Sequence, residues 1–281
     1  MAVHLIKKFS VGVVLIAKWL VLPVLWLSAL PSALAAEPAS PAASPVYDYA
    51  KPKLLTGILY AIGSDRKVIL YTFRRTAVRS NSVVYVERQF LSTNGTVATV
   101  ENVLYESNQL FSFEMQDFQA RVSGAIRIEP DPKNPARQNI FISYAHGLHP
   151  PKGRARTLQP DTVIDDTLYP FMMTHWDDLM QGKTVRFHFV SLDWERTFEF
   201  DLMKTGDSVQ NHQPVAQITM KPASIFISRL VKPLIFTVQE NNTRRILSYI
   251  GRTTPRVKKG NSWKYLDAET VFDYQATDVR K

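Results

Sequence analysis

The sequence predicts a mainly β protein in which a curved antiparallel sheet, a half-barrel or open barrel, packs on one main α-helix. Short apolar-alternating segments, separated by turn residues, follow one another from Leu54 onward. Only one segment, Pro170–Gln181, has the clear spacing of an amphipathic helix. The chain is cysteine-free and 45% hydrophobic, so burial without disulfides has to stabilise the fold.

The first strands are expected between Leu54 and Ile128, at a spacing typical of an antiparallel meander. Gly63-Ser64-Asp65 and Asn94-Gly95 mark turns between them, and the second is a strong hairpin signal. The expected strands are Leu54–Tyr60, Val68–Thr76, Ser82–Leu91, Thr96–Tyr105, Leu110–Phe118 and Arg121–Ile128.

A proline-rich segment, residues 129–170, interrupts this pattern with one expected short strand at Asn139–Tyr144. Long ordered loops often carry function, so we consider a site here. His146 and His149 form a His-x-x-His pair that suits zinc or copper. A catalytic zinc usually needs a third protein ligand, which the sequence does not clearly supply. No metal site is therefore predicted, and these two histidines are the only candidates for one.

The predicted helix has signals at both ends. Asp165 or Asp166 can cap its start, Pro170 suits its first turn and Gly182 its end. Its apolar residues fall at i, i+4, i+7 and i+8, on one face. They are Met172, Trp176, Leu179 and Met180. This face has to be buried, and the sheet offers the large apolar surface that could cover it.

The strands resume after the helix. Thr184–Val190 and Trp194–Leu202 are expected to form a hairpin with Leu192-Asp193 as its turn. That register sets Arg186 opposite Glu199 and Phe187 opposite Phe198, so polar residues meet polar and apolar meet apolar. Later strands are expected at Pro214–Met220, Leu234–Gln239, Arg245–Gly251 and Thr270–Tyr274.

The start of the chain, Met1–Ala36, is typical of a bacterial export signal, with two lysines, an apolar run and small residues at its end. Cleavage near Ala35/Ala36 would leave a periplasmic or secreted protein. The alternative is an N-terminal membrane anchor facing the periplasm. Lys18 disfavours it, because a lysine near the bilayer centre costs ~2.5–3.5 kcal/mol. A flexible Ala/Pro/Ser-rich leader at 37–53 and a single β-rich domain at 54–281 follow.

The formal net charge is +9. In an exported protein this charge favours an anionic envelope surface over nucleic acid, and no nucleic-acid partner is expected; it also suits ordinary solubility. The densest basic stretch lies near the C-terminus and is interleaved with Trp263 and Tyr265. It suits an anionic membrane surface or a solvated face. Its predicted patch residues are Arg252, Arg256, Lys258 and Lys259.

A ligand-binding site is predicted around Arg196, which shares the apolar face of its strand with three aromatic residues. At the rim of an apolar cavity this guanidinium could hold a phosphate or carboxylate headgroup; alternatively it reaches back to water. The predicted ligand-binding residues are Arg196, Trp194, Phe198, Phe200, Met172, Trp176 and Met180. The sequence contains no nucleophile elbow, zinc-protease motif, phosphate loop or dinucleotide fingerprint, so no catalytic residue and no cofactor are predicted.

The meander at Leu54–Ile128, the helix and the following hairpins resemble, in architecture, exported domains in which an antiparallel sheet curls around a helix, as in lipoprotein carriers and envelope lipid chaperones. Phe171–Lys183 and Phe236–Arg252 are similar to segments of exported bacterial proteins of unknown function. The resemblance implies an uncharacterised, non-enzymatic binder or carrier of an apolar or lipid-like molecule.

Two alternative functions are also predicted. One is an envelope hydrolase with its site at 129–166, using His146, His149 or Asp161. The other is an envelope scaffold that binds a protein partner or the membrane surface through a sheet edge or the basic patch.

Overall fold

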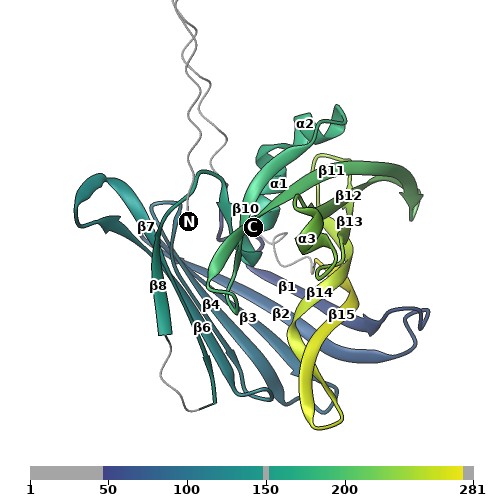
Figure 1. The fold of residues 1–281 in the computed structure, drawn as a ribbon. Coiled ribbons are helices and arrows are strands. Elements are labelled where there is room, and N and C mark those ends of the chain that lie inside the picture. Colours follow the sequence, from purple (N-terminus) through teal and green to yellow (C-terminus); the bar gives the residue numbers. More distant parts are fainter. Residues whose placement is uncertain (1–46, 148–151, 275–281) are drawn as a thin grey trace, which may run out of the picture. The chain divides into compact units, whose positions relative to one another are not determined.

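Fifteen strands join into one sheet in the computed structural model of the protein, which describes residues 47–147 and 152–274 (Figure 1). These residues belong to one compact unit. The elements are β1 Leu54–Ala61, β2 Ile69–Ser80, β3 Val83–Ser92, β4 Val97–Glu106, β5 Gln109–Asp117, β6 Val122–Asp131, β7 Asn134–His146, β8 Lys152–Thr157, β9 Thr162–Val163, α1 Asp165–Thr174, α2 Trp176–Met180, β10 Val185–Ser191, β11 Arg196–Gln210, β12 Gln213–Pro222, α3 Ile225–Ser228, β13 Leu234–Gln239, β14 Ile246–Lys259 and β15 Ser262–Asp273.

The sheet order follows the chain in two runs. It reads β8-β7-β6-β5-β4-β3-β2-β1-β15-β14-β13-β12-β11-β10-β9, and the β1–β15 pair joins the runs. All pairs are antiparallel except β9 with β10. The prediction of a mainly β protein with a large antiparallel sheet is confirmed, and the sheet is not closed into a barrel.

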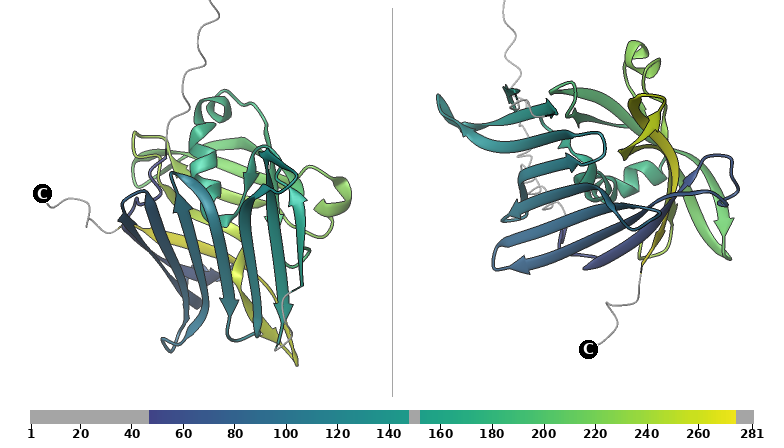
Figure 2. Two further views of the ribbon diagram at one scale, coloured as in Figure 1. Left: turned by 90° about the vertical axis from the view of Figure 1, so that its left-hand side faces the viewer. Right: turned by 90° about the horizontal axis from the view of Figure 1, so that it is seen from below.

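The sheet curves strongly, so that its two edges approach each other (Figure 2). Side chains span the opening between them. Arg154 on edge strand β8 lies 3.3 Å from the Glu195 carboxylate, and Arg156 donates to the Glu195 carbonyl at 3.2 Å. Leu192 packs so closely on β6 that a Cβ at Gly124 would lie 3.0 Å from it. The two edges of the sheet are therefore joined by side-chain contacts and not by strand pairing.

The predicted strands of the first meander are confirmed as β1 to β6, with boundaries shifted by a few residues. Their turns have the expected left-handed backbone: Gly63 has φ 78° and Gly95 has φ 82°. A further two-residue turn at Ser107-Asn108, with φ of 50° and 60°, joins β4 to β5. Short turns of this kind hold consecutive strands in register.

The proline-rich segment is mostly strand rather than loop. β6 and β7 extend through much of it, and β8 and β9 form the two edges of the sheet. Pro130 pairs with Gln138 and Asp131 with Asn134, so Pro135 falls in a bulge between paired positions. At an unpaired position the missing N–H of proline costs no hydrogen bond between the strands, so the hairpin can continue past it.

The predicted helix is two short helices. α1 begins at Asp165, five residues before the predicted start, and contains Pro170. The chain leaves helical geometry at His175, with φ −101° and ψ 16°, and α2 follows. The N-cap is Ile164, whose N–H is bonded to the Thr167 hydroxyl at 2.9 Å, so neither aspartate acts as the cap.

The predicted hairpin between β10 and β11 exists, but its predicted register is wrong. Arg186 lies opposite Asp201 and Phe187 opposite Phe200, two residues beyond the predicted partners. The strands are joined by a four-residue turn ending at Glu195, which adopts φ 48°. Because the shift is even, each side chain still faces the predicted side of the sheet.

The core consists of three buried clusters. The first lies between β2 and β7 and includes Tyr105 and Ile142. The second combines the apolar residues of α1 and α2 with β10 to β14, and Met172 and Leu179 have no exposed surface in it. The third joins β1 to β4 with β15. No helix within the described residues has the length and apolar character needed to cross a membrane.

Candidate functional site

The main candidate site is a hollow of about 470 Å³ on the enclosed side of the sheet. One wall comes from β5, β6 and β7, and includes Phe113, Ile126 and Tyr144. The opposite wall comes from β10, β11, the α3 segment and β14. These strands are far apart in the sheet order and face each other because the sheet curves. Most of the lining is apolar, as expected for a small-molecule site.

Five of the sequence-predicted residues line this hollow. Trp194 and Phe198 are in edge-to-face contact, with ring centroids 5.0 Å apart. Phe200 lies next along the same strand and is buried. Arg252 and Arg256, predicted as part of a surface patch, also line the hollow. The structure therefore brings part of the predicted ligand site and part of the predicted anion patch to one place.

The other predicted ligand-binding residues lie elsewhere. Met172 and Trp176 are 0% and 4% exposed in the helix-to-sheet core, and Met180 is half-buried against the same cluster. Arg196 is exposed, with its guanidinium 5.8 Å from the centre of the Phe198 ring. The apolar face of the helices is buried in this cluster and does not line the hollow.

The remaining patch and metal candidates are also dispersed. Lys258 and Lys259 are exposed at the end of β14. His146 is exposed at the end of β7, and His149 lies outside the described residues. Asp161 lines a separate surface groove beside Gln159 and Thr162. No group of three or more His, Cys, Asp or Glu residues in the described chain is arranged to hold a metal ion.

Arg256 is the most informative polar group of the hollow. It donates to the Tyr144 hydroxyl, and its guanidinium lies 4.8 Å from the centre of the Tyr265 ring. Arg252 lies 4.4 Å from the same ring and is paired with Asp267 at 2.9 Å. Within residues 47–147 and 152–274 Arg256 forms no salt bridge, although its charge acts on the nearby Asp117.

Two acidic groups lie near this charge. Asp117 and Asp193 also line the hollow, and burial raises the pKa of Asp117 against the hydrogen bond from the Ala120 N–H and the charge of Arg256. The Asp117 Oδ2 atom is buried without a hydrogen-bond partner in the described structure. An unpartnered buried oxygen beside a cation suits a ligand head that both accepts and donates hydrogen bonds.

A buried ionic cluster adjoins the hollow at the start of α1. Asp166 lies 3.1 Å from the Arg75 Nε atom and accepts from the Tyr105 hydroxyl at 2.7 Å. Asp165 lies 2.6 Å from Arg88, and Arg88 lies 2.9 Å from Glu101. The two aspartates therefore anchor the helix to β2, β3 and β4.

The protonation of this cluster is set by burial and neighbouring charge. Burial alone would raise the pKa of Asp166, but Arg75 and Arg88 hold it below its usual range. Burial raises the pKa of Glu101 to about 7, against the opposing charge of Arg88 and the hydrogen bond from Thr254. Glu101 lines the hollow, so the cluster and the candidate site share a wall.

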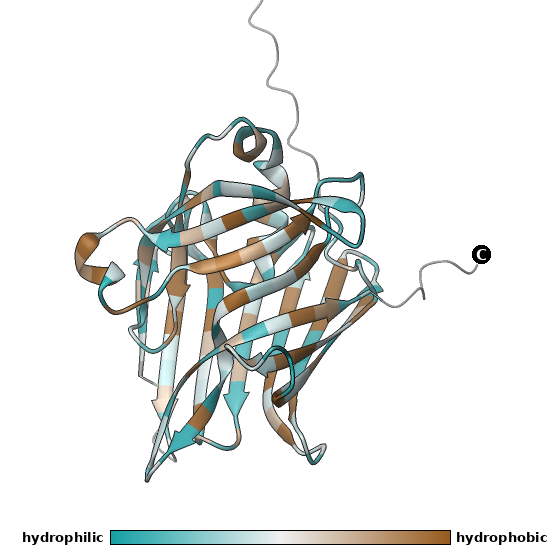
Figure 3. Ribbon diagram, turned by 90° about the vertical axis from the view of Figure 1, so that its right-hand side faces the viewer, coloured by the Kyte–Doolittle hydropathy of each residue, from teal (hydrophilic) through white to brown (hydrophobic). Residues whose placement is uncertain are grey.

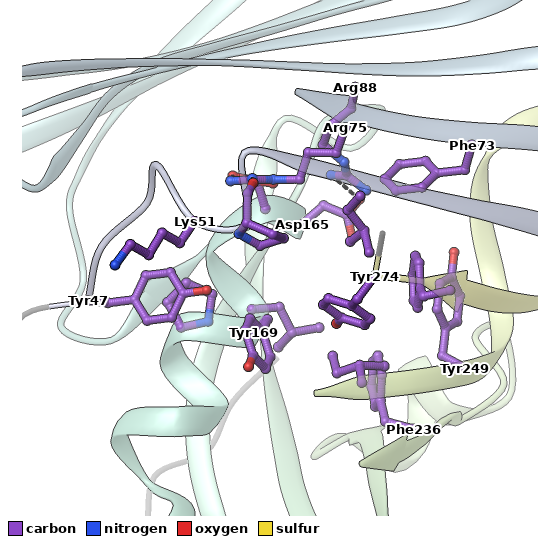
Figure 4. Close-up of a pocket in the computed structure, with 17 residues that line it drawn as sticks. Tyr47, Lys51, Phe73, Arg75, Arg88, Asp165, Tyr169, Phe236, Tyr249 and Tyr274 are labelled. Atoms are coloured by element: carbon purple, nitrogen blue, oxygen red, sulfur yellow. Dashed lines mark hydrogen bonds and ion pairs between the residues drawn. The ribbon is translucent and has the colours of Figure 1, made fainter. Parts of the chain in front are cut away.

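A smaller hollow of about 110 Å³ also borders this cluster (Figure 4). Arg75, Arg88 and Asp165 lie together along one side of it, and aromatic rings, including those of Tyr169 and Tyr274, lie opposite (Figure 4). Burial raises the pKa of Tyr274 well above its usual range. Because this space is small and its charged groups are paired with one another, we treat it as part of the structural core.

Sequence reasoning missed Tyr144, Asp117, Glu101 and Tyr265 as site residues. Tyr144 and Arg256 are 112 residues apart, and no local pattern relates them. A signal for Glu101 does exist, because it lies two residues from both Thr99 and Val103 and therefore shares their inward face of β4. A carboxylate at an inward position requires a partner, which is a reason to look for buried bases nearby.

Comparison with known proteins leaves the family open. No protein-family model matches the sequence, and no curated protein matches it. One solved structure, a beta-barrel-like protein of the domain of unknown function DUF1849 from Brucella abortus, is 7% identical with a TM-score of 0.37; the likeness covers 78% of this chain and 93% of that one. A DUF1329 family protein from Desulfovibrio piger is 9% identical with a TM-score of 0.21, over 80% and 85% of the two chains. Likeness at this level assigns no function.

Proposed function

We propose that this protein is a non-enzymatic binder or carrier of an apolar or lipid-like molecule in the cell envelope, and that the hollow between β5–β7 and β10–β14 holds its ligand. The observation that carries the proposal is a mostly apolar space of about 470 Å³ whose wall holds Arg256, a cation without a salt bridge in the described part of the chain. The predicted export signal supports the location, and it lies outside the described residues.

The lining also indicates the ligand's form. Aromatic and aliphatic side chains, among them Phe113, Phe198 and Phe200, suit a hydrocarbon body. The polar end holds Arg256, the Tyr144 hydroxyl and the buried Asp117 carboxyl group. Charges of both signs meet there, so a neutral or zwitterionic head with hydrogen-bond donors and acceptors fits better than a bare anion. We therefore propose an amphiphile whose head lies against β7 and β14.

Filling the hollow tests this proposal. Met115→Trp adds volume at a position that lines the space and is 9% exposed, so it is expected to weaken binding of a fluorescent acyl-chain probe about tenfold or more. Met203→Trp is the matched control, because Met203 is half-buried and does not line the hollow. Equal affinities for the two variants and the unmodified protein would overturn the proposed site.

The polar end is tested separately. Arg256→Met removes the charge and keeps the aliphatic length, and we expect about tenfold weaker binding of a zwitterionic amphiphile, because a hydrogen bond to a charged group contributes ~1.5–3 kcal/mol. Lys258→Met is the control, since Lys258 is exposed. Native mass spectrometry of protein from envelope extracts gives an independent readout. A clean mass without ligand, together with no thermal shift across an amphiphile panel, would contradict the proposal.

A further inference from the structure

The last two residues of β12 and the connection that follows them toward β13, residues 221–232 and named here the α3 loop, expose three large apolar side chains. Ile225 is 68% exposed, Phe226 74% and Leu230 61%. They lie within six residues of one another on a segment that protrudes from the domain (Figure 2). Figure 3 shows this short helix as a hydrophobic projection. A clustered exposed apolar surface of this kind is typical of an interaction site.

The α3 loop has apolar side chains toward the hollow and also toward solvent. Ile227, Leu230 and Val231 line the hollow, whereas Ile225 and Phe226 are outside its lining and face solvent. Trp194, 44% exposed, also belongs to the wall of the hollow. One short segment therefore contributes some apolar residues to the wall of the hollow and exposes others, Ile225 and Phe226, to solvent.

The charge of the α3 loop indicates the partner. Its charged residues are Lys221, Arg229 and Lys232, and it contains no acidic residue. All three basic residues are exposed, and Lys232 is 3.7 Å from Asp267 while its own side chain stays 83% exposed. Exposed apolar residues flanked by basic residues fit a bilayer that offers acyl chains beneath anionic headgroups.

We propose that the α3 loop docks the domain on an anionic lipid surface. Ile225 and Phe226 enter the boundary between headgroups and acyl chains, and the three basic residues contact lipid phosphates. This surface is distinct from the basic stretch at the end of β14. The docking goes beyond the proposed function: it requires no ligand in the hollow, but it would bring the wall of that hollow to the membrane.

Vesicle co-sedimentation tests the docking. The protein is expected to bind vesicles of phosphatidylcholine with phosphatidylglycerol, to bind weakly to phosphatidylcholine alone, and to lose part of its binding in high salt. The variant Ile225→Ser/Phe226→Ser should bind the anionic vesicles about tenfold or more weakly. Val209→Ser is the matched control, because Val209 is 73% exposed on the β11–β12 hairpin. Equal sedimentation of the double variant and the control would overturn the proposal.

The cysteine-free sequence allows a site-specific readout of insertion. Phe226→Cys and Val209→Cys each create one attachment point for a polarity-sensitive dye. On anionic vesicles the dye at position 226 should shift its emission to shorter wavelength, and the dye at 209 should not. No shift at 226, or the same shift at both positions, would contradict insertion of the α3 loop.

Docking and ligand binding fail in distinguishable ways. Neither Ile225 nor Phe226 lines the hollow, so their serine variant should retain the affinity for the acyl-chain probe in solution. Met115→Trp should lose probe binding and still sediment with anionic vesicles. Loss of both properties in the serine variant would show that the α3 loop supports the hollow, and would overturn its role as an independent docking element.

Discussion

Asp166→Ala is expected to lower the free energy of unfolding by about 3–5 kcal/mol. The carboxylate is 5% exposed and is the ionic partner of Arg75, whose side chain is 9% exposed. The other contacts of Arg75 are the uncharged carbonyls of Pro52 and Tyr49, which do not neutralise it. Removing Asp166 leaves this cation buried and also takes the acceptor from the Tyr105 hydroxyl.

Urea unfolding with an unchanged m-value is the appropriate measurement. Asp177→Ala is the control, because Asp177 is 86% exposed and lies 3.8 Å from Arg244, so its loss should cost less than about 1 kcal/mol. The double variant Arg75→Met/Asp166→Ala should recover part of the stability, since no charge is then left unpaired. An effect of Asp166→Ala no larger than that of Asp177→Ala would contradict the anchoring role of this pair.

The ionic cluster also defines what the sequence can predict here. Arg75, Arg88 and Glu101 are consecutive cross-strand partners on β2, β3 and β4. Each occupies an inward-facing position of its strand. The alternation that correctly predicts the strands therefore also predicts that these three charged side chains face inward. Their partners on α1 could not be inferred, because nothing local specifies that the helix begins at Asp165 and lies against these strands.

The candidate site could be predicted only in part, for a similar reason. Alternation along β11 correctly groups Phe198 with Phe200, and both line the hollow. The opposite wall depends on curvature and on the β1–β15 pair, which are properties of the whole sheet rather than of any segment. Arg196 shares their predicted face, but it follows a turn whose length depends on the left-handed backbone of Glu195. Residue type alone does not specify that conformation.

Stability is expected to fall as the pH rises from about 4.5 to about 7, because the folded protein retains a proton on Glu101 that the unfolded chain releases. Burial raises the pKa of this carboxyl group in the folded state, so its contribution is greatest below the unfolded pKa and is lost as the pH passes through the folded pKa. Over this window the loss is on the order of 3 kcal/mol. Asp166 acts at lower pH, since its pKa is depressed and its contribution is lost on acidification.

Glu101→Gln should remove this dependence and make the protein more stable than the unmodified chain at about pH 8. Glutamine keeps an oxygen for the Thr254 hydroxyl, which now donates to Glu101 at 2.7 Å, and Arg88 retains Asp165 as its ionic partner. Glu114→Gln on β5 is the control, because Glu114 is exposed and should leave the pH profile unchanged. Urea unfolding at several pH values measures all three proteins. Parallel profiles for Glu101→Gln and the unmodified protein would show that Glu101 is ionised throughout, with Arg88 outweighing its burial.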